Sequence, residues 1–127
     1  MTTPKQLERL ERKKAERKQR ALANKESRIK YEDCMLGVKN RDGWKCAICN
    51  KDYSNNKKGL QAAHILSKEN YPELMLDPMN IISLCFYHHK NAQISSHLDG
   101  FVFTQWLRKH RPEQYNYLVL FLVRHDL

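Results

Sequence analysis

The sequence predicts an α+β fold: one small domain preceded by a basic helical arm. Two short runs, residues 60–65 and 80–84, are typical of strands, and a segment rich in turn residues separates them. From about residue 88 to residue 97 the pattern becomes helical. We therefore expect strand, strand, helix and two packing helices in residues 41–127, and the arm in residues 1–40.

Two helices are expected at the C-terminal end, after the break at Asp99 and Gly100. The apolar face of the first is expected to consist of Phe101, Val102, Trp106 and Leu107. Pro112 suits the first turn of the second, because a proline there loses no helical hydrogen bond. The residues that recur at three- and four-residue steps in that helix are Tyr115, Leu118, Val119 and Leu122.

The net charge of +9 is concentrated in the arm. Residues 1–30 contain eleven Lys and Arg against four Glu, whereas the remainder contains twelve basic and ten acidic residues. A basic arm on a nearly neutral body is typical of proteins that bind nucleic acid. The alternative is a solvated charged helix. The side chains expected to contact DNA are Arg12, Lys13, Lys14, Arg17, Lys18 and Arg20.

The four cysteines favour metal binding over disulfides. The chain opens with charged and polar residues and contains no apolar N-terminal run, so we expect no signal peptide and no membrane span. A cytoplasmic location follows, in the bacterial host if the protein is encoded by a phage. In that reducing compartment thiols remain available as metal ligands.

Two pairs of metal-binding residue types have two residues between their members: Cys46 with Cys49, and Cys85 with His88. Structural zinc takes four thiolate or imidazole ligands in a tetrahedron, so these residues predict a Cys3His zinc site. The alternative is that Cys85 is a buried apolar cysteine and His88 a surface residue. Cys34 is left over and is expected to be a partly buried thiol.

Three further polar residues, His64, Asn80 and His89, lie around these pairs. A neutral imidazole at position 64 can take a proton from water near pH 7. Each residue alone has an ordinary explanation: a strand histidine, a turn residue after Pro78 and a surface histidine on a helix. Their order around the cysteine pairs is what suggests a catalytic site.

The layout of these residues resembles the HNH endonucleases, the zinc-bearing branch of the ββα-metal (His-Me finger) nucleases. The resemblance covers roughly residues 41–97, and a softer similarity at residues 103–118 is to small phage-type members. The residues that carry it are Arg41-Asp42-Gly43-Trp44-Lys45-Cys46-Ala47-Ile48-Cys49, Ala63-His64-Ile65, Asn80-Ile81-Ile82-Ser83-Leu84-Cys85 and His88-His89.

The resemblance implies a ββα-metal core and hydrolysis of DNA phosphodiester bonds, by nicking or by cutting duplex DNA. His64 would be the general base that activates water. Asn80 would orient His64 and shape the adjoining loop. His89 would ligate a catalytic Mg2+ or Mn2+ that stabilises the charge developing on the phosphate.

Two positions depart from the family's pattern. Many members have an acidic or histidine ligand immediately before the base, where this chain has Ala63, and some have a histidine where it has Gln93. Water and the substrate phosphate would then complete the coordination of the cation. His97 is a further candidate ligand or phosphate contact, unless it is a surface histidine.

Two alternatives belong to other functional classes. The first is a non-catalytic, zinc-stabilised DNA-binding module in which His64 and His89 are structural. The second is a protein-interaction module with a charged helix, which would show no salt-dependent binding to DNA.

Overall fold

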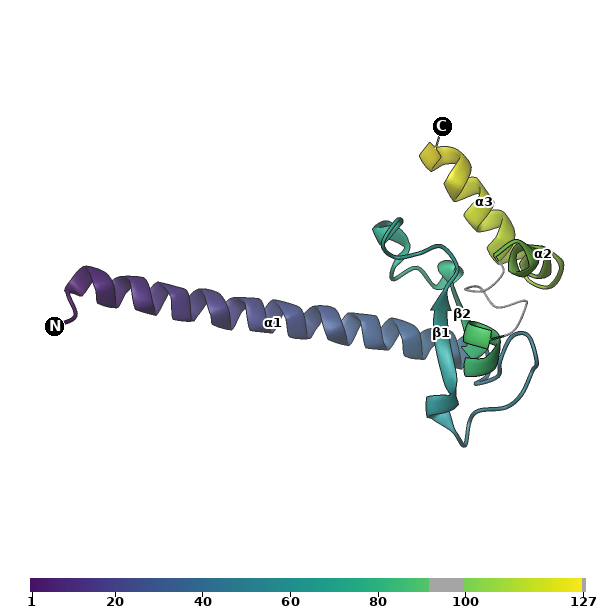
Figure 1. The fold of residues 1–127 in the computed structure, drawn as a ribbon, viewed down its shortest axis with the longest axis horizontal. Helices are drawn as coiled ribbons and strands as arrows, with labels where there is room; N and C mark the ends of the chain where they lie inside the picture. The colour runs from purple at the N-terminus through teal and green to yellow at the C-terminus, as the bar shows by residue number, and fades with distance from the viewer. Residues whose placement is uncertain (92–99, 127) are drawn as a thin grey trace. The chain divides into compact units, whose positions relative to one another are not determined.

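The computed structural model describes residues 1–91 and 100–126 and confirms the α+β prediction (Figure 1). The chain divides into two compact units, Met1–Asp33 and Cys34–Leu127. Helix α1, Pro4–Arg41, contributes residues to both units. None of the helices described in the structure combines the length and the apolar character that crossing a bilayer requires.

Local sequence signals determine where helix α1 begins. The Thr3 hydroxyl accepts a hydrogen bond from the backbone N–H of Gln6 (3.2 Å), and the Gln6 side chain accepts one from the N–H of Thr3 (2.8 Å). This reciprocal pair satisfies two N–H groups that the first turn of a helix cannot satisfy internally. Pro4 occupies the first helical position, where its missing N–H costs nothing.

Helix α1 ends immediately before Asp42 and Gly43. Gly43 has a φ of 67°, and Trp44 has a φ of 59°, a region that non-glycine residues seldom adopt. The N–H of Trp44 bonds to the Lys39 carbonyl (2.9 Å), so the turn satisfies a terminal carbonyl of the helix. The Trp44 indole also donates to the Asn40 side chain (2.7 Å), which holds the ring beside the end of the helix.

Strands β1, Leu60–His64, and β2, Ile81–Cys85, form an antiparallel pair (Figure 1). The observed bounds lie within one residue of those predicted. Leu60 pairs with Cys85 and His64 pairs with Ile81. All five residues of β2 are buried, so this strand is the centre of the core. Three 3₁₀ turns flank the strands: η1, Lys57–Gly59; η2, Pro72–Leu74; and η3, Pro78–Asn80.

The chain continues from β2 into a single π-helical turn, η4, Tyr87–Asn91. Helices α2, Gly100–His110, and α3, Pro112–Asp126, follow and pack on each other. Pro112 opens α3 as predicted. The part of the expected helix beyond residue 91, including Gln93 and His97, lies outside the described residues.

The apolar faces of α2 and α3 differ from the prediction in part: Leu107 and Leu118 are buried as expected, whereas Phe101 and Val119 are exposed. Phe101 is 74% exposed, and the buried residues of α2 are Phe103 and Leu107. In α3 Val119 is 37% exposed, whereas Leu118 and the polar Gln114 are buried. The face of α3 is rotated because Gln114 turns inward to bond backbone carbonyls. Sequence periodicity treats a glutamine as a surface residue and therefore misses this.

Asp42 is the centre of a buried polar network that joins three segments of the second unit. Its side chain is 2% exposed and accepts hydrogen bonds from Arg41 (2.9 Å), Arg111 (3.2 Å) and the backbone N–H of Ser83 (3.0 Å). Burial alone raises the pKa of Asp42, but the hydrogen bonds from Arg41 and Ser83 and the charge of Arg41 outweigh it and leave the pKa lowered.

The arginines of this network extend it to backbone carbonyls. Arg41 donates to the carbonyls of Pro78 (2.7 Å) and Ile81 (2.8 Å). Arg111 bonds the side chain of Gln114, which in turn donates to the carbonyl of Ile81 (3.2 Å). The network thereby fixes the end of α1 and the start of α3 against the first residue of β2.

Asp42→Asn should destabilise the zinc-loaded protein by about 3 kcal/mol, because two arginines lose their buried counter-charge. Urea unfolding at pH 7 measures the effect, and Asp52→Asn, at an exposed carboxylate, should change stability little.

The folded pKa of Asp42 lies below its ordinary value of 3.8, so the stabilisation that Asp42 provides is lost as the pH falls through that lower pKa. The difference between wild type and variant should therefore narrow below about pH 4. Equal stability of the two proteins at pH 7 would contradict this role.

Candidate functional site

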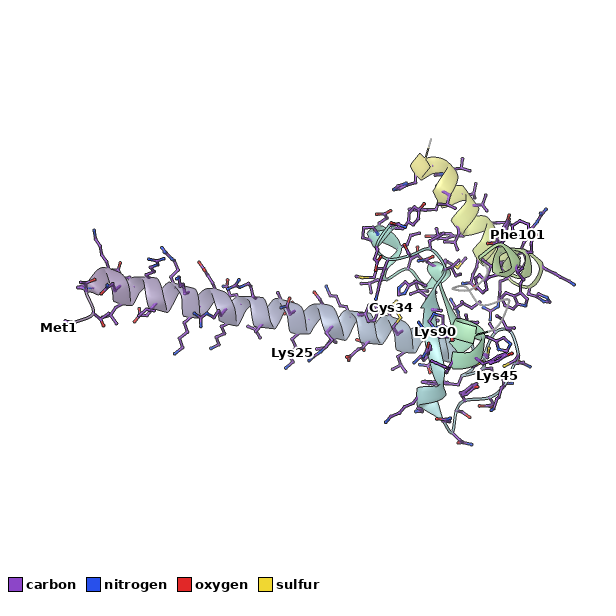
Figure 2. All side chains as sticks on the ribbon, in the orientation of Figure 1. Met1, Lys25, Cys34, Lys45, Lys90 and Phe101 are labelled. Atoms are coloured by element: carbon purple, nitrogen blue, oxygen red, sulfur yellow. The ribbon has the colours of Figure 1, made fainter. Side chains whose placement is uncertain are left out.

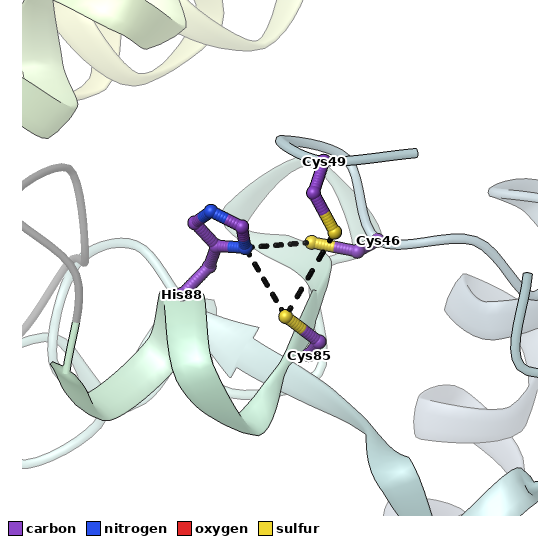
Figure 3. A group of neighbouring side chains, drawn as sticks. All are labelled: Cys46, Cys49, Cys85 and His88. Atoms are coloured by element: carbon purple, nitrogen blue, oxygen red, sulfur yellow. Dashed lines mark hydrogen bonds between the residues drawn. The ribbon is translucent and has the colours of Figure 1, made fainter. Parts of the chain in front are cut away.

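Two segments far apart in sequence, residues 46–49 and 85–88, bring four metal-binding side chains together. The ligand atoms of Cys46, Cys49, Cys85 and His88 all lie within 4.8 Å of one another. Figure 3 shows the Nδ1 side of the His88 ring facing the three sulfur atoms. Cys46 and Cys85 are buried, His88 is half-buried and Cys49 is exposed. This group could hold a metal ion such as zinc.

The spacing of the ligand atoms fits a tetrahedral zinc ion. Zinc–sulfur bonds of about 2.3 Å place two ligand atoms about 3.8 Å apart in a tetrahedron. Nδ1 of His88 lies 3.7 Å from the Cys46 sulfur and 3.1 Å from the Cys85 sulfur, and the sulfurs of Cys49 and Cys85 are 4.0 Å apart. Burial lowers the pKa of His88, which favours the neutral imidazole that a metal requires.

Backbone hydrogen bonds shape the turn that carries Cys46 and Cys49. The N–H of Asn50 bonds to the Cys46 carbonyl (2.8 Å), and Asn50 has a φ of 62°. The N–H of Ala47 bonds to the carbonyl of Ser83 in β2 (2.9 Å). This bond attaches the turn to the strand that ends at Cys85.

Tyr53 lies beside the sulfur cluster. Its pKa is raised, first because the phenol is withdrawn from water and then by the neighbouring Cys85, with smaller effects from Cys49 and Cys46. A Cβ atom at Gly59 would lie 2.7 Å from the Tyr53 ring, so a larger residue there would displace the ring. Sequence analysis assigned no role to either residue, because a tyrosine and a glycine in a polar loop carry no distinctive signal.

His64 ends strand β1, at the end of the β ladder away from Cys85. Four residue steps separate the two ends, or about 13 Å along the strand. Nε2 of His64 lies 2.8 Å from the Met75 carbonyl oxygen. A carbonyl oxygen only accepts, so Nε2 carries the proton, and Nδ1 is the basic nitrogen of the neutral ring.

Asn80 is fully buried and organises the loop that follows His64. Its side-chain oxygen accepts from the N–H of Leu66 (2.7 Å), and its amide donates to the carbonyls of Leu66 (3.0 Å) and Leu74 (3.3 Å). Its own carbonyl accepts from the N–H of Ile65 (2.8 Å). Asn80 and His64 therefore hold successive carbonyls, those of Leu74 and Met75, in the same loop.

His89 lies on η4, directly after the cluster residue His88, and faces strand β1. Its Nδ1 is hydrogen-bonded to the side-chain oxygen of Gln61. Because an amide oxygen only accepts, Nδ1 carries the proton of this hydrogen bond. Gln61 and Ala63 are two residues apart on β1 and share one face of the strand. Gln61 is not among the residues that the sequence pattern singled out.

The structure thus brings the four cluster residues together and places His64 and Asn80 on either side of one loop. Among the described residues, the Cys3His cluster is the one group of His, Cys, Asp or Glu side chains that could hold a metal ion. A cavity of about 340 Å³ lies elsewhere, between Arg41, His110, Arg111 and Gln114. None of the predicted catalytic or metal-binding residues lines it.

Cys49→Ser should release bound zinc and unfold the second unit. Zinc binding of about 10 kcal/mol or more, as found in small zinc domains, is comparable to the whole stability of a domain of this size. Zinc content and thermal unfolding of the purified variant measure the effect. Cys34→Ser is the matched control, because Cys34 lies outside the cluster, with its sulfur 3.4 Å from the Leu76 carbonyl oxygen. Full zinc content in the Cys49 variant would refute the assignment.

Comparison of the chain with protein-family models, with curated proteins and with solved structures gives no match. The functional interpretation of the site therefore depends on the residues and their geometry. Its main elements are the Cys3His cluster, the hydrogen-bonded His64 and the pairing of His89 with Gln61.

Proposed function

We propose that the protein is a metal-dependent DNA endonuclease of the HNH type. The observation that carries the proposal is the placement of two histidines by hydrogen bonds: Nε2 of His64 to the Met75 carbonyl, and Nδ1 of His89 to the side chain of Gln61. The cluster residue His88 is adjacent to His89, so one zinc-stabilised turn would hold the second histidine against β1. Two antiparallel strands followed by η4 are compatible with a ββα-metal core.

His64 is the general base in this proposal. Its Nε2–H bond to Met75 fixes the ring, and Nδ1 takes a proton from the attacking water. The water oxygen forms a bond to phosphorus while the bond from phosphorus to the 3′ oxygen breaks. Asn80 is a positioning residue, since its bonds to Leu66 and Leu74 hold the loop that carries the Met75 carbonyl.

His89 and Gln61 form the binding side of the site. Gln61 holds the proton on Nδ1 of His89 and so directs Nε2 toward the cation, an arrangement common for metal-bound histidines. Ala63 has no atom that could ligate the cation, so the protein supplies few ligands. Such a site suits Mg2+ or Mn2+, which can retain several bound waters. When bound, the cation supplies positive charge to the phosphate and to the leaving oxygen.

The basic arm supplies general affinity for DNA in this proposal. Lysine and arginine contacts to phosphates make affinity strongly dependent on salt and carry no sequence information. The protein would therefore recognise the phosphodiester backbone, which is the same at every position of DNA, rather than the identity of the bases.

His64→Ala should reduce nicking of supercoiled plasmid by at least about 100-fold, because the general base is removed. Nicking is measured with the zinc-loaded protein in Mg2+ and in Mn2+. The control is His110→Ala, an exposed histidine on α2 that should retain wild-type activity. Binding to DNA should survive both changes. Binding without nicking in the wild type would instead identify a non-catalytic DNA-binding module.

Gln61→Met, which removes the acceptor at nearly constant size, should weaken activation by Mn2+ about 10- to 100-fold. Gln61→Glu keeps an oxygen acceptor and should restore much of the activation. Zinc content should be unchanged in both variants, since Gln61 is not one of the four cluster ligands. The measurement is the Mn2+ concentration that gives half-maximal nicking. An unchanged activation curve in the Met variant would rule out the positioning role.

A further inference from the structure

The positive charge of the first unit lies on one side of helix α1. An α-helix turns by about 100° per residue, so each side chain has a fixed direction around the axis. Residues 4–30 then separate into two faces. The first, which we call the basic face, includes Lys5, Arg9, Arg12, Lys13, Arg17 and Arg20. Arg28 and Lys30 continue it, and its one acidic residue is Glu16, so its net charge is +7.

The opposite face is electrically neutral. It carries three lysines, Lys14, Lys18 and Lys25, and three glutamates, Glu8, Glu11 and Glu26. The larger apolar side chains Leu7, Leu22 and Ile29 also lie there. The whole net charge of residues 1–30 therefore belongs to the basic face. Two of the lysines that the sequence suggested as DNA contacts, Lys14 and Lys18, point the other way.

The helix does not neutralise this charge itself. Every residue from 1 to 30 is exposed, and Figure 2 shows side chains projecting all around the helix. Within residues 1–33 the ion pair found is Arg28 with Glu32, at 4.0 Å and with both side chains about two-thirds exposed. A pair of this kind contributes little. The cationic groups of the basic face are therefore available for an external anion.

We infer that the basic face of α1 binds the phosphate backbone of duplex DNA while the opposite face remains in solvent. This inference rests on the proposed DNA-binding function and adds an orientation to it. From Lys5 to Lys30 the face is about 38 Å long, comparable to one turn of B-DNA at about 34 Å. A regular, closely spaced polyanion is the partner that a row of solvent-exposed cations of this length suits.

The helix itself provides a matched test of this orientation. One triple variant replaces Lys5, Lys13 and Lys30 on the basic face with Gln, and the other replaces Lys14, Lys18 and Lys25 on the opposite face. Both remove three lysines from the same helix, and glutamine has a helix propensity close to that of lysine. Net charge, residue type and helical content are therefore equal, and the face alone differs.

Affinity for a 5′-fluorescein duplex of about 30 base pairs is measured by anisotropy over a range of NaCl concentrations, using the full zinc-loaded chain in EDTA-free buffer without Mg2+ or Mn2+. The basic-face variant should bind at least about tenfold more weakly at 0.1 M salt, and its salt slope should fall by about 2.7. The opposite-face variant should keep the wild-type slope. The helix is about 10 Å wide, so the lysines of the opposite face lie about one Debye length from DNA bound on the basic face. At that distance salt screens most of their interaction with the phosphates.

Equal losses of slope in the two variants would overturn the inference, since charge without direction would then explain binding. The result is independent of catalysis because no divalent cation is added. If the two variants differ in salt slope but the wild-type protein never nicks DNA, the basic face is supported and the nuclease proposal is refuted. If the wild-type protein nicks DNA but the two variants have equal salt slopes, the nuclease proposal stands and the basic face is refuted.

Discussion

The convergence of three thiols and one imidazole is the constraint on which the rest of the second unit depends. Cys46 and Cys49 come from a turn after α1, Cys85 ends β2 and His88 lies on η4. A domain of this size buries a modest core, so a metal ion joining these segments would contribute much of its stability. The same junction determines where His89 lies, since no residue separates it from His88.

The proposed active site is built by hydrogen bonds that fix ring nitrogens rather than by close packing. Met75 and Gln61 each accept a hydrogen bond from a histidine, which fixes the ring nitrogen that carries the proton. Asn80 holds the intervening loop through its buried amide. The buried Asp42 network supports the start of β2, because Arg41 donates hydrogen bonds to the carbonyls of Pro78 and Ile81.

Short-range signals predicted much of this fold, and side-chain partners account for what they missed. The strands, the end of α1 and the start of α3 follow from local turn, apolar and proline patterns. The inward turn of Gln114 and the burial of Asp42 depend on carbonyls and arginines distant in sequence, which a periodic pattern does not contain. Ligand spacing predicted the Cys3His cluster, whereas Gln61 gave no signal because its partner, His89, lies on a different element.

The most direct test of the account is the chemistry of the products formed from an end-labelled DNA duplex. The zinc-loaded protein is incubated with the duplex before and after addition of Mg2+, and the fragment ends are determined by mass spectrometry. The account predicts that Mg2+ produces fragments with 5′-phosphate and 3′-hydroxyl ends, because water attacks phosphorus and the 3′ oxygen leaves. A duplex that remains bound and intact at every Mg2+ concentration would contradict it.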